Sequence, residues 1–239
     1  MTIPLDVLCS TACNRDTTTQ VSTHVAFFDV LRSAVGGSPQ VCIVKTSLLS
    51  TTLKVLDVVS GANHQPSVLV TVRDFYIPCE TYSARLLSQT RLAAAVKGNF
   101  EIVDLTTLET QNLFDPSDPA LEFARRKKVK PLALFRVSSS LFLVCCNKFG
   151  FYIHHTGYLV RDRSLMWWDT TAVAFALQQP HLLVFGASQT EVWNIETADS
   201  VQTMRGKYTL LNTPDARGKI LALSDTIVQL VITEPSSNS

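Results

Sequence analysis

Thiols and imidazoles, the side chains that most often bind zinc, lie near one another in one part of this 239-residue sequence. Cys145 and Cys146 are followed by His154 and His155, with a turn predicted between the two pairs. Adjacent residues of a strand point to opposite faces, so one Cys and one His at most can share a face. Because this falls short of a complete tetrahedral ligand set, we predict no metal and no cofactor.

The remaining cysteines also lack the spacing of a metal site or a disulfide scaffold. Cys9 and Cys13 lie in a Ser/Thr-rich segment, Cys42 lies in an apolar run, and Cys79 stands alone. A free Cys in an apolar run behaves as a small hydrophobic residue. We therefore expect six reduced thiols and a cytoplasmic protein.

No group of residues assembles a catalytic site. The sequence contains no Gly-x-Ser-x-Gly, no P-loop and no His-Glu-x-x-His motif. The carboxylates of Asp57, Asp74, Asp104 and Asp169 are predicted at strand ends, where such groups more often bond to turns than act as acid and base. We expect no enzymatic activity and assign no catalytic residue.

Two features are candidate partner contacts. The first is the basic cluster Arg125, Arg126, Lys127 and Lys128, with Lys130 close behind. It fits a weak contact with an anionic membrane or with an acidic patch of a partner protein. The alternative, which we favour, is that these cations lie in solvent at the end of a helix and interact favourably with the helix dipole.

The second candidate is the pair Trp167 and Trp168. Trp is enriched in protein interfaces, and neighbouring strand positions point opposite ways, which favours one Trp in the core and one outside. Burial of both between sheets is an equal alternative. A third Trp, Trp193, is predicted mid-strand and in the core.

The elements that carry these residues are predominantly strands. Short runs of Val, Ile, Thr, Phe, Tyr and Leu alternate with Gly, Asn, Asp, Ser and Pro. The predicted strands are 24–31, 41–46, 52–58, 68–76, 82–87, 92–96, 101–104, 111–114, 132–137, 141–146, 151–154, 158–161, 173–177, 181–185, 191–195, 201–204, 209–212, 220–223 and 228–232. One short helix is predicted near 118–128, capped by Asp118 with Pro119 at its first position.

The strands form recurring groups of four. Aligning Ile102, Tyr152 and Val192 gives spacings of about 50 and 40 residues, which is typical of propeller blades. The second strand of each group is almost wholly apolar, as expected for a central strand buried on both faces. The predicted fold class is therefore all-β, a β-propeller of four-stranded blades with about five blades present.

Composition excludes several classes of protein. Hydrophobic residues make up 46% and charged residues 17% of the chain, and the net charge is +1. A disordered chain is poorer in apolar residues, and a nucleic-acid binder that works by bulk charge needs a basic surplus. The sequence has no secretory signal pattern and no apolar run of about 18 residues.

Several stretches resemble the citron homology domain of fungal Rho guanine nucleotide exchange factors. They are Ser22-Thr23-His24-Val25-Ala26-Phe27-Phe28, the run 42–56, Asp74-Phe75-Tyr76-Ile77-Pro78, the run 100–111, Leu113-Phe114-Asp115-Pro116-Ser117-Asp118, and 171–177 continuing through Ile195-Glu196-Thr197. Together they span most of the chain from Ser22 to Lys207.

The resemblance implies a non-catalytic interaction module in small-GTPase signalling. Its expected partner is a protein, either a Rho-family GTPase or a protein of the cell cortex or cytoskeleton, and the expected location is the cytoplasm or the cortex. The alternative is a module of a vacuolar tethering protein in membrane traffic. The Dbl-homology and pleckstrin domains of the exchange factors are not in this sequence, so exchange activity is expected from another polypeptide.

The length points to an incomplete ring. A blade takes about 40 to 45 residues, whereas the resemblance implies seven blades and places more sequence before Ser22. We expect an irregular segment at 1–21, the module at 22–233 and a disordered tail at 234–239. Open sheet edges at both ends would favour self-association.

Overall fold

The computed structural model describes residues 21–32, 37–47, 50–59, 68–115, 117–126, 128–212 and 220–230. The structure does not describe Lys127, the cysteines Cys9 and Cys13, residues 1–20 of the irregular segment predicted at 1–21, or the tail predicted at 234–239. The chain divides into two units, 1–112 and 113–239, and each is described by itself.

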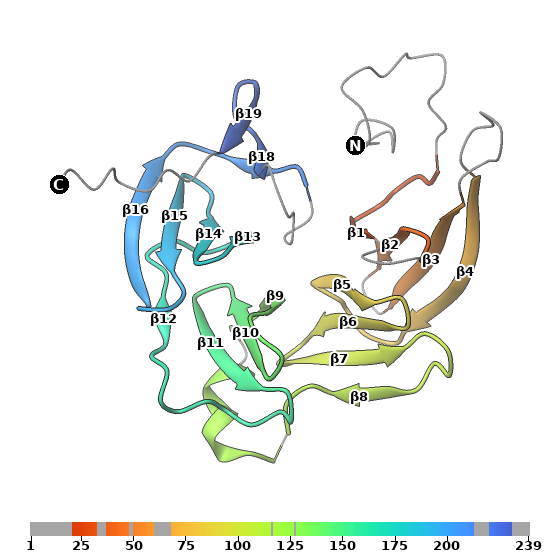
Figure 1. The fold of residues 1–239 in the computed structure, drawn as a ribbon, viewed down its shortest axis with the longest axis horizontal. Helices are drawn as coiled ribbons and strands as arrows, with labels where there is room; N and C mark the ends of the chain where they lie inside the picture. Colours follow the sequence, from red (N-terminus) through yellow and green to blue (C-terminus); the bar gives the residue numbers. More distant parts are fainter. Residues whose placement is uncertain are drawn as a thin grey trace. The chain divides into compact units, whose positions relative to one another are not determined.

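Unit 1 contains two antiparallel four-stranded sheets, which we call blades 1 and 2 (Figure 1). Blade 1 has the strand order β1-β2-β3-β4, with β1 Phe27–Leu31, β2 Gln40–Thr46, β3 Thr51–Val59 and β4 Val68–Ile77. Blade 2 has the order β5-β6-β7-β8, with β5 Ser83–Ser88, β6 Arg91–Val96, β7 Asn99–Asp104 and β8 Thr110–Asn112.

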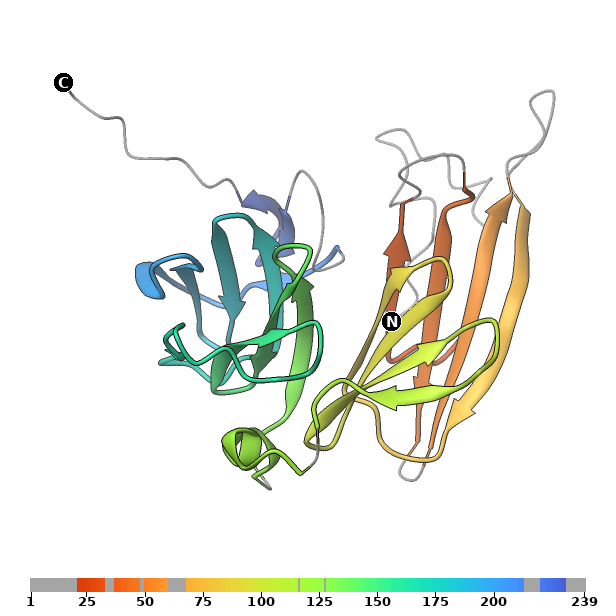
Figure 2. The same cartoon turned by 60° about the horizontal axis from the view of Figure 1, so that its bottom comes forward.

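Unit 2 contains three sheets, blades 3, 4 and 5 (Figure 2). Blade 3 consists of β9 Pro131–Arg136, β10 Leu141–Cys146, β11 Phe149–His154 and β12 Met166–Trp167. Blade 4 consists of β13 Ala174–Gln178, β14 His181–Phe185, β15 Gln189–Asn194 and β16 Asp199–Arg205. Blade 5 has three described strands, β17 Thr209–Leu210, β18 Ile220–Leu223 and β19 Ile227–Leu230.

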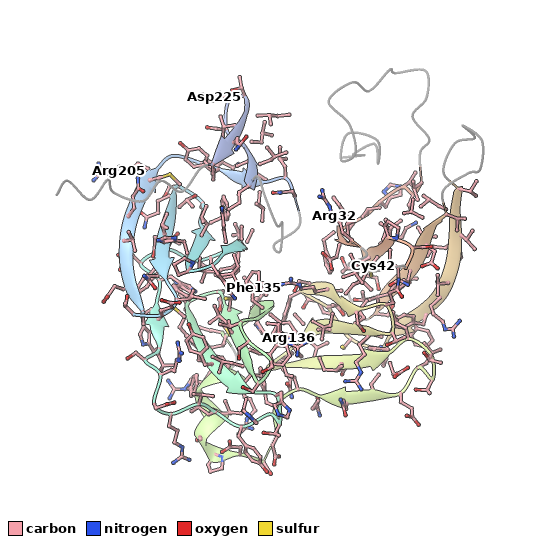
Figure 3. The ribbon with its side chains drawn as sticks, viewed as in Figure 1. Arg32, Cys42, Phe135, Arg136, Arg205 and Asp225 are labelled. Atoms are coloured by element: carbon pink, nitrogen blue, oxygen red, sulfur yellow. The ribbon has the colours of Figure 1, made fainter. Side chains whose placement is uncertain are left out.

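Apolar second strands explain why these sheets pack face to face. In β6, β10 and β14 most residues are buried, and β14 contributes alternate residues to the core shared with blade 3 and to the core shared with blade 5. On the first strand β9, Phe135 is buried and Arg136, the last residue of the strand, is exposed (Figure 3). In blade 1, Cys42 lies in the core shared with blade 2 (Figure 3). Within each unit, the first strands of successive blades contact one another.

Buried polar bonds join successive blades inside a unit. In unit 1 the backbone N–H of Leu86 on β5 donates to the carboxylate of Asp29 on β1, at 2.7 Å. Thr51 on β3 donates its hydroxyl to the carbonyl of Cys79 and accepts from the N–H of Thr81. In unit 2 the hydroxyl of Tyr152 on β11 donates to the carbonyl of Ile195, just after β15.

The predicted helix is present but shorter than expected. It is a 3-10 helix, η3, spanning Pro119–Arg125. Asp118 caps it by accepting from the N–H of Ala120, as the sequence indicated. The expected continuation to residue 128 is wrong, because Arg126 already has extended dihedral angles.

The predicted strands correspond to β1–β19 with one substantive difference. The fourth strand of blade 3 was expected at 158–161, whereas β12 is Met166–Trp167 and residue 159 makes only an isolated bridge to Ile153. Among the described residues, no helix is long and apolar enough to cross a membrane.

Candidate functional site: the outer edge of blade 3

Helix η3 is held against blade 3 by aromatic packing. The ring of Phe123 lies 5.5 Å from that of Phe149 and 5.2 Å from that of Phe151, measured between centroids. Phe149 and Phe151 are two residues apart on β11 and therefore lie on the same face of the sheet. Leu121 and Ala124 of the helix are also buried. This packing places the helix beside β11, the strand that pairs with the outer strand β12.

The two candidate tryptophans have different surroundings. Trp167 on β12 pairs with Phe149 on β11, its ring lies 4.9 Å from the Phe149 ring, and its side chain is 58% exposed. Trp168 is 5% exposed, donates its indole N–H to the carbonyl of Cys146, and packs edge-on against Trp193. Strand alternation thus leaves Trp167 as the surface residue and makes Trp168 a core residue.

The basic cluster is divided by the end of the helix. Arg125 lies in the last turn, and its guanidinium donates to the backbone carbonyls of Asp115 and Asp118. Arg126 and Lys128 lie beyond the helix and are exposed. The dipole interpretation therefore applies to Arg125, whereas Arg126 and Lys128 belong to the connection that leads into β9.

Asn147 joins this basic connection to the β10–β11 turn. Its side chain donates to the carbonyl of Lys128 and accepts from the N–H of Lys130, and its own N–H donates to the carbonyl of Lys130. The next residue in the turn is the exposed Lys148, whose ammonium group donates to Thr171 at 2.5 Å. Lys148 directly precedes Phe149, the pairing partner of Trp167.

We call the resulting surface the blade-3 edge. It consists of Arg126, Lys128, Lys148, Trp167 and the loop 161–165. The contributions of Lys148, Phe149 and the loop were missed by sequence reasoning. A signal that could have revealed the loop is its own composition, Arg161-Asp162-Arg163-Ser164-Leu165, which is unfavourable for a strand.

A buried carboxylate anchors the chain just after Trp167. Glu191 on β15 is fully buried and accepts from the N–H groups of Asp169 and Thr170 at 3.3 and 2.7 Å. It also accepts from the side chains of Gln189 and Trp193 at 3.1 and 3.0 Å. Four donors offset the desolvation of the charge, and the segment that links blades 3 and 4 is held in place.

The cysteines and histidines of blade 3 do not meet. Cys145 pairs with Gly150 near the turn of the β10–β11 hairpin, whereas His154 pairs with Leu141 at the other end. The turn predicted between the two pairs is present, and the pairs lie at opposite ends of the hairpin. Burial raises the pKa of the Cys42 and Cys146 thiols far above the ordinary range, which makes both inert at neutral pH.

Of the carboxylates singled out in the sequence, Asp104 makes the expected turn bonds, whereas Asp57 and Asp74 bond to residues of neighbouring strands. Asp57 accepts from the side chain of Gln40, and Asp74 forms an ion pair with Lys54 at 3.7 Å. Asp104 accepts from the N–H groups of Thr106 and Thr107, which holds its pKa below the usual value. A general acid at neutral pH needs the opposite shift.

One small cavity, of about 160 Å³, lies between blades 3 and 4. Its lining includes Tyr152, Asp162, Arg163 and Glu196. The guanidinium of Arg163 lies 5.1 Å from the Tyr152 ring centroid, a cation–π contact. The charged groups at this cavity are thus the carboxylates of Asp162 and Glu196 and the guanidinium of Arg163.

Comparison with protein families gives one match that covers most of the chain. Residues 1–213 match the model of the CNH (citron homology) domain. A solved structure described as the AfRom2 CNH domain aligns with 96% of this chain and 73% of its own, with 28% identity and a TM-score of 0.75. This likeness confirms the predicted β-propeller fold.

Among characterised proteins, fungal exchange factors are similar to the chain. Rho1 guanine nucleotide exchange factor 1 of Schizosaccharomyces pombe is 35% identical over 215 residues, which cover 84% of this chain and 16% of that protein. Rho1 guanine nucleotide exchange factor 2 of the same yeast is 29% identical, with 91% and 20% covered. The human serine/threonine-protein kinase MRCK beta is 29% identical over 93 residues. The chain thus spans a fifth or less of the length of these relatives.

Proposed function

The chain belongs to the CNH domain family, and from this premise we propose that it is a protein-interaction module of Rho-type GTPase signalling with no exchange reaction of its own. The observation that carries the proposal is the 35% identity to a Rho1 exchange factor over 84% of this chain. The partner we propose is a Rho-family GTPase or a protein of the cell cortex.

The chemistry of the described side chains supports a non-catalytic role. Burial raises the pKa values of the Cys42 and Cys146 thiols, and partial burial raises that of Cys79, which makes all three poor nucleophiles. The carboxyls of Asp104 and Asp115 have lowered pKa values because neighbouring N–H and hydroxyl groups donate to them. These shifts are opposite to those of activated nucleophiles and general acids.

The names of the relatives favour Rho signalling over vacuolar tethering. These relatives are exchange factors and a kinase. The chain covers only 16% of the first exchange factor, so the similarity concerns one module and not the exchange activity of that whole protein. We accordingly propose a cytoplasmic location at the cell cortex, which a fluorescent fusion imaged in live cells would test.

Two measurements on the purified chain test the proposal. In the first, a Rho GTPase loaded with a fluorescent nucleotide is mixed with the chain, and we expect nucleotide release at the uncatalysed rate. Accelerated release would refute the non-catalytic role. In the second, cross-linking and pull-down are performed in detergent-free, lipid-free lysate. Enrichment of Rho-pathway proteins supports the proposal, and recovery of tethering subunits without them would support the alternative.

A further inference from the structure

The outer strand of blade 3 is interrupted by a projecting loop. Along β11, the N–H of Val160 donates to the carbonyl of Tyr152 and the N–H of His154 donates to the carbonyl of Tyr158. Further along, Met166 and Trp167 pair with Gly150 and Phe149. Between these two paired stretches, residues 161–165 leave the sheet, and all five are exposed.

Three large apolar side chains are exposed on and next to the blade-3 edge. Within ten residues, Tyr158 is 60%, Leu165 37% and Trp167 58% exposed. Trp and Tyr are the residues that prefer the boundary between water and lipid, because their rings are apolar and their N–H or O–H is polar. Trp167 is moreover backed by the buried Phe149, which fixes its position.

Exposed cations lie around these apolar side chains. Lys148 adjoins Phe149, and Asn147 links this turn to the backbone at Lys128 and Lys130. Arg126 precedes this connection, and Arg161 begins the projecting loop. On the blade-3 edge the cations Arg126, Lys128, Lys148, Arg161 and Arg163 outnumber the carboxylates, of which Asp162 is the only one, whereas the whole chain has a net charge of only +1.

We propose that the blade-3 edge binds the surface of a membrane that contains anionic phospholipids. Cations attract the headgroups, and Trp167 with Leu165 enters the interface. The blade-3 edge combines exposed cations with the apolar side chains of Leu165 and Trp167, which is the composition of a membrane-surface contact. The inference goes beyond the proposed protein-interaction role, since it concerns a lipid partner.

Binding of the purified full chain to vesicles tests the proposal. Vesicles of phosphatidylcholine mixed with phosphatidylserine should bind the chain in a sedimentation assay, and vesicles of phosphatidylcholine alone should not. Lys128→Glu/Lys148→Glu should weaken binding by a factor of at least about 25, from about fivefold per lost cation. The control Lys45→Glu/Lys97→Glu changes the net charge equally at exposed positions in unit 1 and should bind as the unchanged chain does.

A second measurement tests the role of Trp167. Brominated lipids should quench the tryptophan fluorescence of the bound chain, and this quenching should disappear in Trp167→Phe, because Trp168 and Trp193 are buried. Equal loss of binding in test and control variants, or unchanged quenching in Trp167→Phe, would overturn the proposal. The proposal would also be overturned if the chain did not bind anionic vesicles and the edge variants lost only the binding of a protein partner. The lipid-free pull-down above measures the protein-interaction role separately.

Discussion

Glu191 shows how much a single residue contributes to the geometry of blade 3. It is a fully buried carboxylate, and its acceptor bonds include the backbone N–H groups of Asp169 and Thr170, which follow the Trp167–Trp168 pair. A strand residue of β15 thereby positions a surface feature of the preceding blade. Such a bond network is costly to disturb, because each lost acceptor leaves a buried donor unsatisfied.

Glu191→Gln should destabilise the chain by about 2 kcal/mol. The amide has the shape of the carboxylate but presents an NH₂ group to a pair of donors, one of which is the Trp193 indole. Chemical denaturation would measure the loss. The exposed Glu109→Gln is the control and should change the free energy of unfolding by less than about 0.5 kcal/mol. A variant as stable as the control would show that the buried network contributes little.

Tyr152→Phe should cost about 1 kcal/mol at neutral pH, because the carbonyl of Ile195 loses its donor. The pH dependence follows from burial, which raises the pKa of Tyr152 to about 12 from its ordinary value near 10. The folded state therefore holds this proton more tightly, and the stabilisation is complete below pH 10 and declines as pH rises towards 12. The difference in free energy of unfolding between the unchanged chain and Tyr152→Phe, measured by chemical denaturation, should be constant up to pH 10 and decrease above it. A constant difference up to pH 12 would contradict the assignment.

At the scale of elements, strand β11 determines which of its neighbours are exposed. Phe149 and Phe151 on one face meet helix η3 and Trp167, whereas Gly150 and Tyr152 on the other face meet the core shared with blade 4. The strand thus separates the candidate contact surface from the interior. Gly150 on this strand leaves no room for a larger side chain, because Trp168 packs directly against it.

Gly150→Ala should destabilise blade 3 by about 1 to 3 kcal/mol. A Cβ atom at this position would lie 2.9 Å from two ring atoms of Trp168, and a rigid indole can move only by disturbing its contacts with Phe175 and Trp193. Thermal unfolding measures the effect. Because a smaller ring relieves the clash, Gly150→Ala/Trp168→Phe should lose less than the sum of the two single changes. Strict additivity would argue against this contact.

At the scale of the whole molecule, the near-neutral charge has a consequence for solubility. The net charge of +1 at pH 7 leaves little repulsion between copies of the chain. We expect the lowest solubility near neutral pH, with an increase towards both pH 5 and pH 9. Precipitation by polyethylene glycol across this range would measure it. A solubility that changes in one direction only would contradict the charge argument.

The strands of this protein could be predicted from its sequence because their information is local. Apolar second strands such as 141–146 and 181–185, with turns between them, show both the element type and the blade repeat, and the quoted strings indicate the family. The cap of η3 at Asp118 could be predicted for the same reason. These features depend on a residue and its nearest neighbours along the chain.

Tertiary structure alone decided how the candidate contacts are arranged. Whether Trp167 or Trp168 is exposed depends on the register of β12 against β11, and the fourth strand of this blade was expected eight residues too early, at 158–161. The proximity of Lys128 to Lys148 depends on the bonds of Asn147, which join segments about twenty positions apart. Such pairings are set by sheet register and packing, and a one-residue shift would exchange the two faces of the strand.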